Sequence, residues 1–216
     1  MKNISLALLI IINILLFIIN YSFMFMLNKT ASTSVKPIIY LYPTEEICVN
    51  VKVCYPNKLT HTFPKYNQST GWNVMAKPNG DLIDLNTKRN LYALYWEGIN
   101  NFKIDMTKGF VVEGKDTISF LEKHLALLGL NEREANEFII YWLPKLENNN
   151  YNWIYFVDIE EINRDMPLIV TPKPDTMIRV FMQFKAIGKP IKTQEQVITT
   201  PIRNGFTLVE WGGTEL

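Results

Sequence analysis

The sequence predicts an α+β protein: an N-terminal transmembrane or signal helix, followed by a mainly antiparallel β domain with an inserted helical hairpin. Three observations lead to this prediction. Residues 1–28 contain a long apolar run. Short apolar or alternating runs bounded by Pro, Gly and Asn then recur along the chain, which is typical of strands. Between them, residues 116–146 carry apolar side chains at helical spacing.

The apolar run covers residues 4–27, with no charged residue between Lys2 and Lys29. As a helix rising ~1.5 Å per residue it would be ~36 Å long, enough to cross a ~30 Å hydrocarbon core with some tilt. It is apolar all round, whereas a helix on a soluble domain has one apolar stripe. Its length favours a retained signal anchor, and the small residues 30–32 leave a cleaved signal peptide as the alternative.

Three segments therefore follow one another: a signal anchor or signal peptide (residues 1–28), a polar tether (29–35) and a single exported domain (36–216). The lipid bilayer is the expected partner of residues 4–27. Basic residues on the two sides of the run nearly balance, so the positive-inside rule decides orientation weakly. We expect a single-pass membrane protein with its C-terminal domain outside the cytoplasm, or an extracellular protein released by signal cleavage.

Composition excludes several function classes. The chain has 22 basic and 21 acidic residues, and this balance gives no basic excess for a nucleic-acid partner. Cys48 and Cys54 fall in one alternating run, ~20 Å apart along a strand, so they cannot form a disulfide within it. The two histidines lack metal-ligand spacing, and no phosphate loop or dinucleotide fingerprint occurs, so no metal or cofactor is predicted.

Strand patterns account for most of the exported domain. One hairpin is predicted from residues 46–55 and 59–63, and it would place His61 opposite Lys52. Residues 160–165 form a short helix, and residues 186–204 are extended without a clear element. The predicted strands are residues 37–43, 46–55, 59–63, 72–76, 82–85, 90–98, 109–114, 153–157, 167–170, 176–184 and 205–213.

The helical hairpin has explicit start and stop signals. Asp116 is placed as the N-cap of the first helix, and Gly129 ends it as a C′ residue. Asn131 caps the second helix, with Glu134 at the capping-box position. Pro144 falls near the end of the second helix and should bend or stop it.

Several segments, in order, resemble a family of uncharacterised bacterial proteins that are often exported or membrane-attached. The resemblance spans residues 36–213 and implies a single exported domain, without an established reaction or site residues. It is carried by KPIIYLYP (Lys36–Pro43), YWEG (Tyr95–Gly98), GFVVEG (Gly109–Gly114), NERE followed by YWLPKLE (Tyr141–Glu147), PKPDTMIRVFM (Pro172–Met182) and GFTLVEWGG (Gly205–Gly213).

Two Trp/Glu/Gly clusters are the candidate site. Trp96 and Trp211 are the candidate ligand-binding residues, because an indole packs on the apolar face of a sugar ring. Glu97 and Glu210 are the candidate catalytic pair, because glycoside hydrolysis needs two carboxyls ~5–10 Å apart. The competing interpretation places both indoles in the core, with the neighbouring carboxylates on the other face of each strand.

These observations predict a surface binding or structural module whose partner is a carbohydrate or a surface protein. The alternative is an exported hydrolase acting on carbohydrate or a cell-wall polymer, with Glu97 and Glu210 as acid and base. A second alternative is a thiol nucleophile, with Cys54 activated by His61 across the predicted hairpin.

Overall fold

The computed structural model describes residues 33–216 except 36, 56–58 and 101–103. The predicted anchor at residues 4–27 lies outside the described residues. Residues 33–35, which the sequence assigned to the tether, form strand β1 (Thr33–Val35). Within the part of the chain that is described, no helix is long and apolar enough to cross a bilayer.

A large central sheet, sheet A, organises the domain. Its only parallel neighbours are β12 and β13, and all its other pairs among the described residues are antiparallel. Gly98 pairs with both Leu59 and Val35, so β4 lies on one edge of β8 and β1, continued by β2, on the other. The strands in order across the sheet are β4 (Leu59–Phe63), β8 (Leu94–Asn100), β1 with β2 (Ile38–Tyr42), β13 (Thr207–Glu215), β12 (Thr176–Ile187), β10 (Tyr151–Phe156) and β9 (Phe110–Glu113).

A smaller sheet, sheet B, packs against one face of sheet A. The apolar side chains between the two sheets form one core, which includes Ile39 and Leu41 of β2. The short helix α4 (Ile159–Asp165) contributes Ile162 to this core. The strands of sheet B, in order, are β11 (Leu168–Thr171), β3 (Ile47–Val53), β5 (Trp72–Ala76), β6 (Leu82–Asp84) and β7 (Asn90–Leu91).

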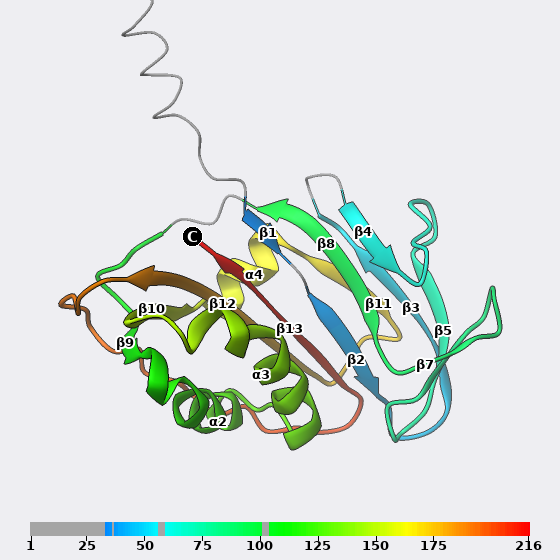
Figure 1. Cartoon of the computed structure of the whole chain (residues 1–216). Helices are drawn as coiled ribbons and strands as arrows, with labels where there is room; N and C mark the ends of the chain where they lie inside the picture. The colour runs from blue at the N-terminus through cyan, green and yellow to red at the C-terminus, as the bar shows by residue number, and fades with distance from the viewer. Residues whose placement is uncertain (1–32, 36, 56–58, 101–103) are drawn as a thin grey trace, which may run out of the picture. The chain divides into compact units, whose positions relative to one another are not determined.

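The other face of sheet A carries a helical hairpin and a second core. Helices α2 (Thr117–Leu127) and α3 (Glu132–Leu146) follow the 3₁₀ turn η1 (Gly114–Asp116) and pack on this face. Because side chains alternate along a strand, Tyr40 joins this core while its neighbours Ile39 and Leu41 join the first. The helices lie over the β9–β13 side of the sheet and leave β8 uncovered by any helix (Figure 1). The prediction of a mainly antiparallel α+β domain is confirmed for the described residues.

The ends of the helical hairpin follow the predicted capping signals. Gly129 has φ +89°, and the Leu130 N–H donates to the Leu125 carbonyl, which closes α2. The Asn131 side chain accepts from the Glu134 N–H at 2.9 Å, and the Glu134 carboxylate accepts from the Asn131 N–H at 2.8 Å. Pro144 lies within α3, which ends two residues later at Leu146. The side chain of Asp116 makes no capping hydrogen bond, although it occupies the N-cap position of α2.

The predicted hairpin between residues 46–55 and 59–63 is wrong. Strand β3 has β5 on one side and β11 on the other, so neither of its edges is open to β4. Strand β4 instead pairs with β8 in sheet A, where His61 lies opposite Glu97 and Phe63 opposite Tyr95. The turn signal at residues 55–58 indicates a change of direction, but it carries no information about which sheet receives the next strand.

Candidate functional site

Trp96 and Glu210 meet in the interior, on the face of sheet A that packs against sheet B. The Trp96 Nε1–H donates to Glu210 Oε1 at 3.0 Å. Arg179 Nε donates to Glu210 Oε2 at 2.7 Å, and its Nη1 donates to Asn163 Oδ1 at 3.0 Å. Trp96 is fully buried, and the exposed fractions of the whole residues Glu210 and Arg179 are 3% and 5%. This network holds the strands together and leaves no surface on which a ligand could stack.

Glu97 and Trp211 lie on the opposite, helix-bearing face of sheet A. The register shows this, because β2 aligns Ile38 with both Tyr95 and Trp211, and aligns Ile39 with Glu210. Glu97 follows Tyr95 by two residues and therefore shares its face. The structure thus places Glu97 and Glu210 on opposite faces of one sheet, whereas a two-carboxyl mechanism needs both in one cleft.

Trp211 is also a core residue. It is 2% exposed, its Nε1–H donates to the Tyr40 hydroxyl at 3.1 Å, and its ring meets Phe138 of α3 edge-on at 5.3 Å between centroids. Burial raises the pKa of Tyr40, whose hydroxyl donates to Glu137 at 2.6 Å. Neither candidate indole is therefore available to a sugar ring from solvent.

Glu97 forms a cluster with Tyr95 of its own strand and with His61, which the hairpin prediction had placed elsewhere. His61 Nδ1 lies 2.9 Å from Glu97 Oε2, and the Tyr95 hydroxyl donates to Glu97 Oε1. Burial, followed by this bond to Glu97, raises the pKa of Tyr95 above its ordinary 10.0, so the hydroxyl stays protonated at physiological pH. Cys54 follows β3 in sheet B, whereas His61 belongs to sheet A, so the proposed thiol–imidazole pair is not built on one hairpin.

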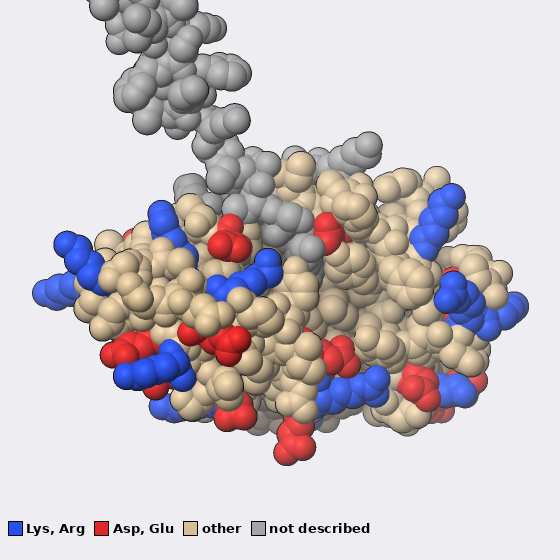
Figure 2. Space-filling view, viewed as in Figure 1, with Lys and Arg blue, Asp and Glu red and all other residues tan. Residues whose placement is uncertain are grey.

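A hollow of about 220 Å³ lies over the part of sheet A that the helices leave open. Figure 2 shows that this face of the molecule is hollowed to the right of its centre. Figure 1, drawn from the same side, shows β2 and β8 at this place. Tyr95, whose hydroxyl donates to Glu97, is one of the residues that line this hollow. Side chains from β2, β4, β8 and the segment through β7 line it: Ile38, Phe63, Arg89, Asn90, Leu91, Tyr92, Ala93 and Tyr95.

A second hollow of about 520 Å³ adjoins the first. The two share Asn90, Leu91 and Tyr92, and the second is also lined by Lys77, Asp81, Leu82, Ile83 and Arg133. We call the two together the open-face groove. Asn90, Leu91 and Tyr92 therefore form a wall that the two hollows share.

Two exposed aromatic side chains in the open-face groove are each approached by an arginine. Phe63 is 48% and Tyr92 47% exposed. The guanidinium carbon of Arg89 lies 5.7 Å from the Phe63 centroid, and that of Arg133 lies 5.0 Å from the Tyr92 centroid. Cation–π contacts of this kind hold flat side chains in defined orientations at a surface. The groove therefore offers apolar ring surface beside hydrogen-bond donors.

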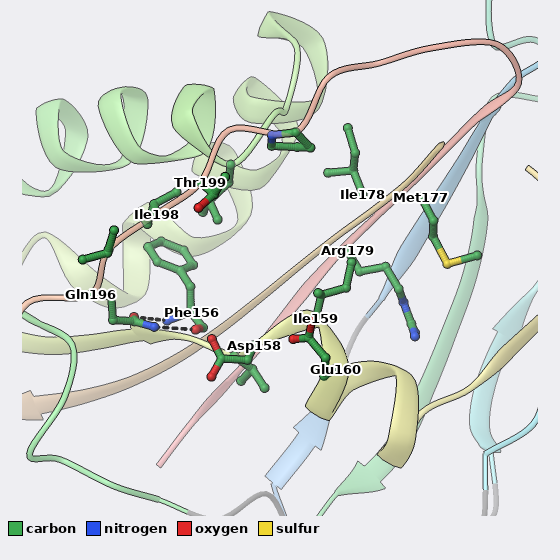
Figure 3. Close-up of a pocket in the computed structure, with 14 residues that line it drawn as sticks. Phe156, Asp158, Ile159, Glu160, Met177, Ile178, Arg179, Gln196, Ile198 and Thr199 are labelled. Carbon is green, nitrogen blue, oxygen red and sulfur yellow. Dashed lines mark hydrogen bonds between the residues drawn. The ribbon is translucent and has the colours of Figure 1, made fainter. Parts of the chain in front are cut away.

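A separate pocket of about 350 Å³ lies beneath the extended segment that follows β12 (Figure 3). Gln196 fixes this segment, because its amide accepts from the Phe156 N–H and donates to the Phe156 carbonyl, both at 2.8 Å. Phe156 and Ile198 give the pocket apolar walls, and Asp158 lies beside them. Phe156 is the only aromatic residue that lines this pocket and is 4% exposed, so the pocket offers a ligand less aromatic surface than the open-face groove does.

The signals for these groove residues were weak in the sequence. Phe63 comes from one segment and Arg89 and Tyr92 from another, and none of the three belongs to a motif. Because residues 90–98 were predicted to form a single strand, nothing in the sequence indicated that Tyr92 would lie at a break in that strand. The structure breaks that run after Leu91, and β7 belongs to sheet B whereas β8 belongs to sheet A. Tyr92 lies at this crossing between the sheets, where its side chain reaches the surface.

Comparison with known proteins identifies one bacterial relative of this chain. No protein-family model matches the sequence, and no solved structure matches it significantly. A segment of 72 residues is 36% identical to the "Uncharacterized protein in bglA 3'region" of Butyrivibrio fibrisolvens, and it covers 33% of this chain and 73% of the relative. That name indicates no activity. Because the match covers most of the relative, this chain belongs to the same family as the Butyrivibrio protein.

Proposed function

We propose that this protein is a carbohydrate-binding module outside the cytoplasm, and that the open-face groove binds the glycan. The observation that carries the proposal is the pair of exposed aromatic side chains, Phe63 and Tyr92, in a concave groove. The C–H groups on the faces of a pyranose are apolar and pack on aromatic rings, while its hydroxyls need hydrogen-bond partners. Arg89, Asn90 and Tyr95 bring such partners to the same hollow.

The dimensions of the groove favour a sugar chain over a protein surface. A specific protein interface buries ~800 Å² on each partner and is built around a well-packed apolar centre. Here the first hollow has a volume of about 220 Å³, suited to one ring-sized group, and the second adjoins it at Asn90, Leu91 and Tyr92. A linear glycan would place successive rings in the two hollows.

The proposal is one of binding without hydrolysis. Retaining and inverting glycosidases both use two carboxyl groups that flank the scissile bond. Glu97 is engaged by His61 and Tyr95 on one face of sheet A, and Glu210 is buried against Arg179 on the other. Glu97 and Glu210 therefore do not form such a pair.

The membrane part of the proposal rests on the length and apolar character of residues 4–27. Residues 33–216 would then stand outside the cytoplasm, either anchored or released by signal cleavage. Protease added to intact cells should digest this part of an anchored chain while a cytoplasmic control protein survives. Recovery of the full-length, uncleaved chain among freely soluble cytosolic proteins would contradict the proposal.

Truncation of the groove aromatics should weaken glycan binding. We expect Phe63→Ala and Tyr92→Ala each to lower affinity about tenfold, ~1.4 kcal/mol, because each removes one stacking surface. The double variant should lose about 100-fold if the two rings contact different sugars. A glycan array with the full-length protein would identify the ligand, and isothermal titration calorimetry would measure affinity.

The matched control is Ile169→Ala, which truncates an apolar side chain that is 53% exposed on β11 of sheet B. This variant should bind as the wild type does. Wild-type affinity in the double variant Phe63→Ala/Tyr92→Ala would exclude the open-face groove as the glycan site. A surface protein captured with an affinity that depends on Phe63 and Tyr92, with no glycan bound, would replace the carbohydrate proposal.

A further inference from the structure

We infer that the glycan is anionic, and that Arg89 binds the carboxylate of a uronic acid residue in the open-face groove. This inference rests on the proposed function and adds the chemical class of its ligand.

Arg89 differs from the other arginines in its partners. The chain has five arginines, and all of them lie in the part that the structure describes. Within that part, four have a carboxylate partner: Arg133 with Glu137, Arg164 with Asp165, Arg179 with Glu210 and Arg203 with Glu134. Arg89 has none there, and its guanidinium contacts the ring of Phe63 instead. Its donors are therefore available to a ligand in the groove.

The backbone at Arg89 is held firmly by a turn. The Asp84 N–H donates to the Arg89 carbonyl at 3.0 Å, and the Lys88 N–H donates to the Asp84 carbonyl at 2.8 Å. Asp84 as a whole residue is 5% exposed. Its carboxylate accepts from the Asn86 N–H at 2.9 Å and from the Thr87 hydroxyl at 2.8 Å. This carboxylate is committed to the turn, which presents Arg89 with little backbone freedom.

The charges lining the groove favour an anion. Arg89, Lys77 and Arg133 line it, against the carboxylate of Asp81 and that of Glu137, which pairs with Arg133. Asp81 accepts from the side chain of Asn79 at 2.8 Å within the turn between β5 and β6. The carboxylate of Glu97 is engaged by His61 and by the hydroxyl of Tyr95. The groove is therefore locally basic in a chain whose formal net charge is only +1.

A guanidinium beside an aromatic ring suits a carboxylated sugar. Its planar fork donates two parallel hydrogen bonds to one carboxylate, and its charge strengthens both. The neighbouring ring of Phe63 can pack on the sugar to which that carboxylate is attached. A neutral sugar would use the same ring but would leave the charge of Arg89 unpaired. Affinity should therefore depend on the ligand's charge as well as on its ring.

The test compares acidic oligosaccharides with their own methyl esters. The full-length protein would be titrated with oligogalacturonate and with oligomannuronate, each as the free acid and as its methyl ester. The ester keeps the sugar ring and removes the charge. We expect at least one free acid to bind about tenfold or more tighter than its ester, and we expect added salt to reduce this difference because the site is exposed.

Variants connect the effect to Arg89. Arg89→Gln should remove the preference for the free acid, so that the ratio of the affinities for acid and ester falls to about one. Arg164→Gln is the matched control, because it removes an exposed arginine of α4 that does not line the groove. This control should keep the wild-type preference for the acid. Polyglutamate serves as a carboxylate polymer without sugar rings and should bind more weakly than the acidic oligosaccharide.

The outcomes separate this inference from the proposed function. Equal binding of acids and esters, with dependence on Phe63 and Tyr92, would overturn the anionic ligand and keep the carbohydrate module. Acid preference that persists in Arg89→Gln, or equal binding of polyglutamate, would also overturn the inference. Failure to bind any acid, ester or neutral glycan would overturn both.

Discussion

Replacing Arg179 by Met is expected to lower the free energy of unfolding by about 3–5 kcal/mol, because it leaves a buried carboxylate without its counter-charge. Arg179 Nη2 lies 2.6 Å from Glu210 Oε2, and both side chains are almost completely buried, at 1% and 3% exposure. The parallel pair β12–β13 carries both residues directly opposite each other. Urea denaturation followed by circular dichroism would measure the loss.

The double variant Arg179→Met/Glu210→Leu is the control for this prediction. It removes both charges and fills the site with apolar side chains of similar size, so it should recover most of the stability that the single variant loses. In this variant the Trp96 Nε1–H would lose its acceptor. The free energy of unfolding should therefore remain about 1–3 kcal/mol below full recovery. A loss below about 1 kcal/mol in Arg179→Met would argue that the pair is hydrated rather than buried.

Trp96→Ala should destabilise the domain by about 3–5 kcal/mol, the usual cost of removing a large aromatic side chain from a packed core. Trp96 is fully buried and its ring lies 5.1 Å from that of Tyr55, between centroids. It also donates to Glu210, so the substitution would leave a cavity and remove a hydrogen bond. Thermal or urea unfolding of purified protein would give the difference.

Trp96→Phe separates the two contributions. Phe keeps much of the ring volume and loses the N–H donor, so most of its effect should come from the unpaired carboxylate oxygen of Glu210. We expect a smaller loss than in Trp96→Ala. If Trp96→Ala abolished glycan binding and left stability unchanged, the indole would be a binding surface, contrary to its burial.

The elements that were predicted correctly are those with local signals. The capping box of Asn131 and Glu134 and the C′ glycine Gly129 specify helix ends through contacts within five residues. Strand β5 follows the predicted range, and β6 pairs back to it across the turn at residues 78–81. Alternation also predicted that Trp96 and Glu97 would point to opposite faces, and that Glu210 and Trp211 would do the same.

The pairing of strands could not be read from the sequence, because it depends on which sheet edge is open. Residues 55–58 indicate a change of direction, and the simplest expectation joined the strands on either side into a hairpin. The structure sends them to different sheets, and this exchange creates the contact between His61 and Glu97. It also places Phe63 beside Tyr95 in the open-face groove. The groove is a product of long-range pairing, so no local pattern predicts it.

The central claim is that the open-face groove binds a sugar chain. A crystal structure of the full-length protein with the tightest-binding acidic oligosaccharide would test it most directly. We predict a sugar ring stacked on Phe63 or Tyr92, with a carboxylate on Arg89. Electron density for the oligosaccharide in the pocket beneath Gln196, with the open-face groove empty, would contradict it.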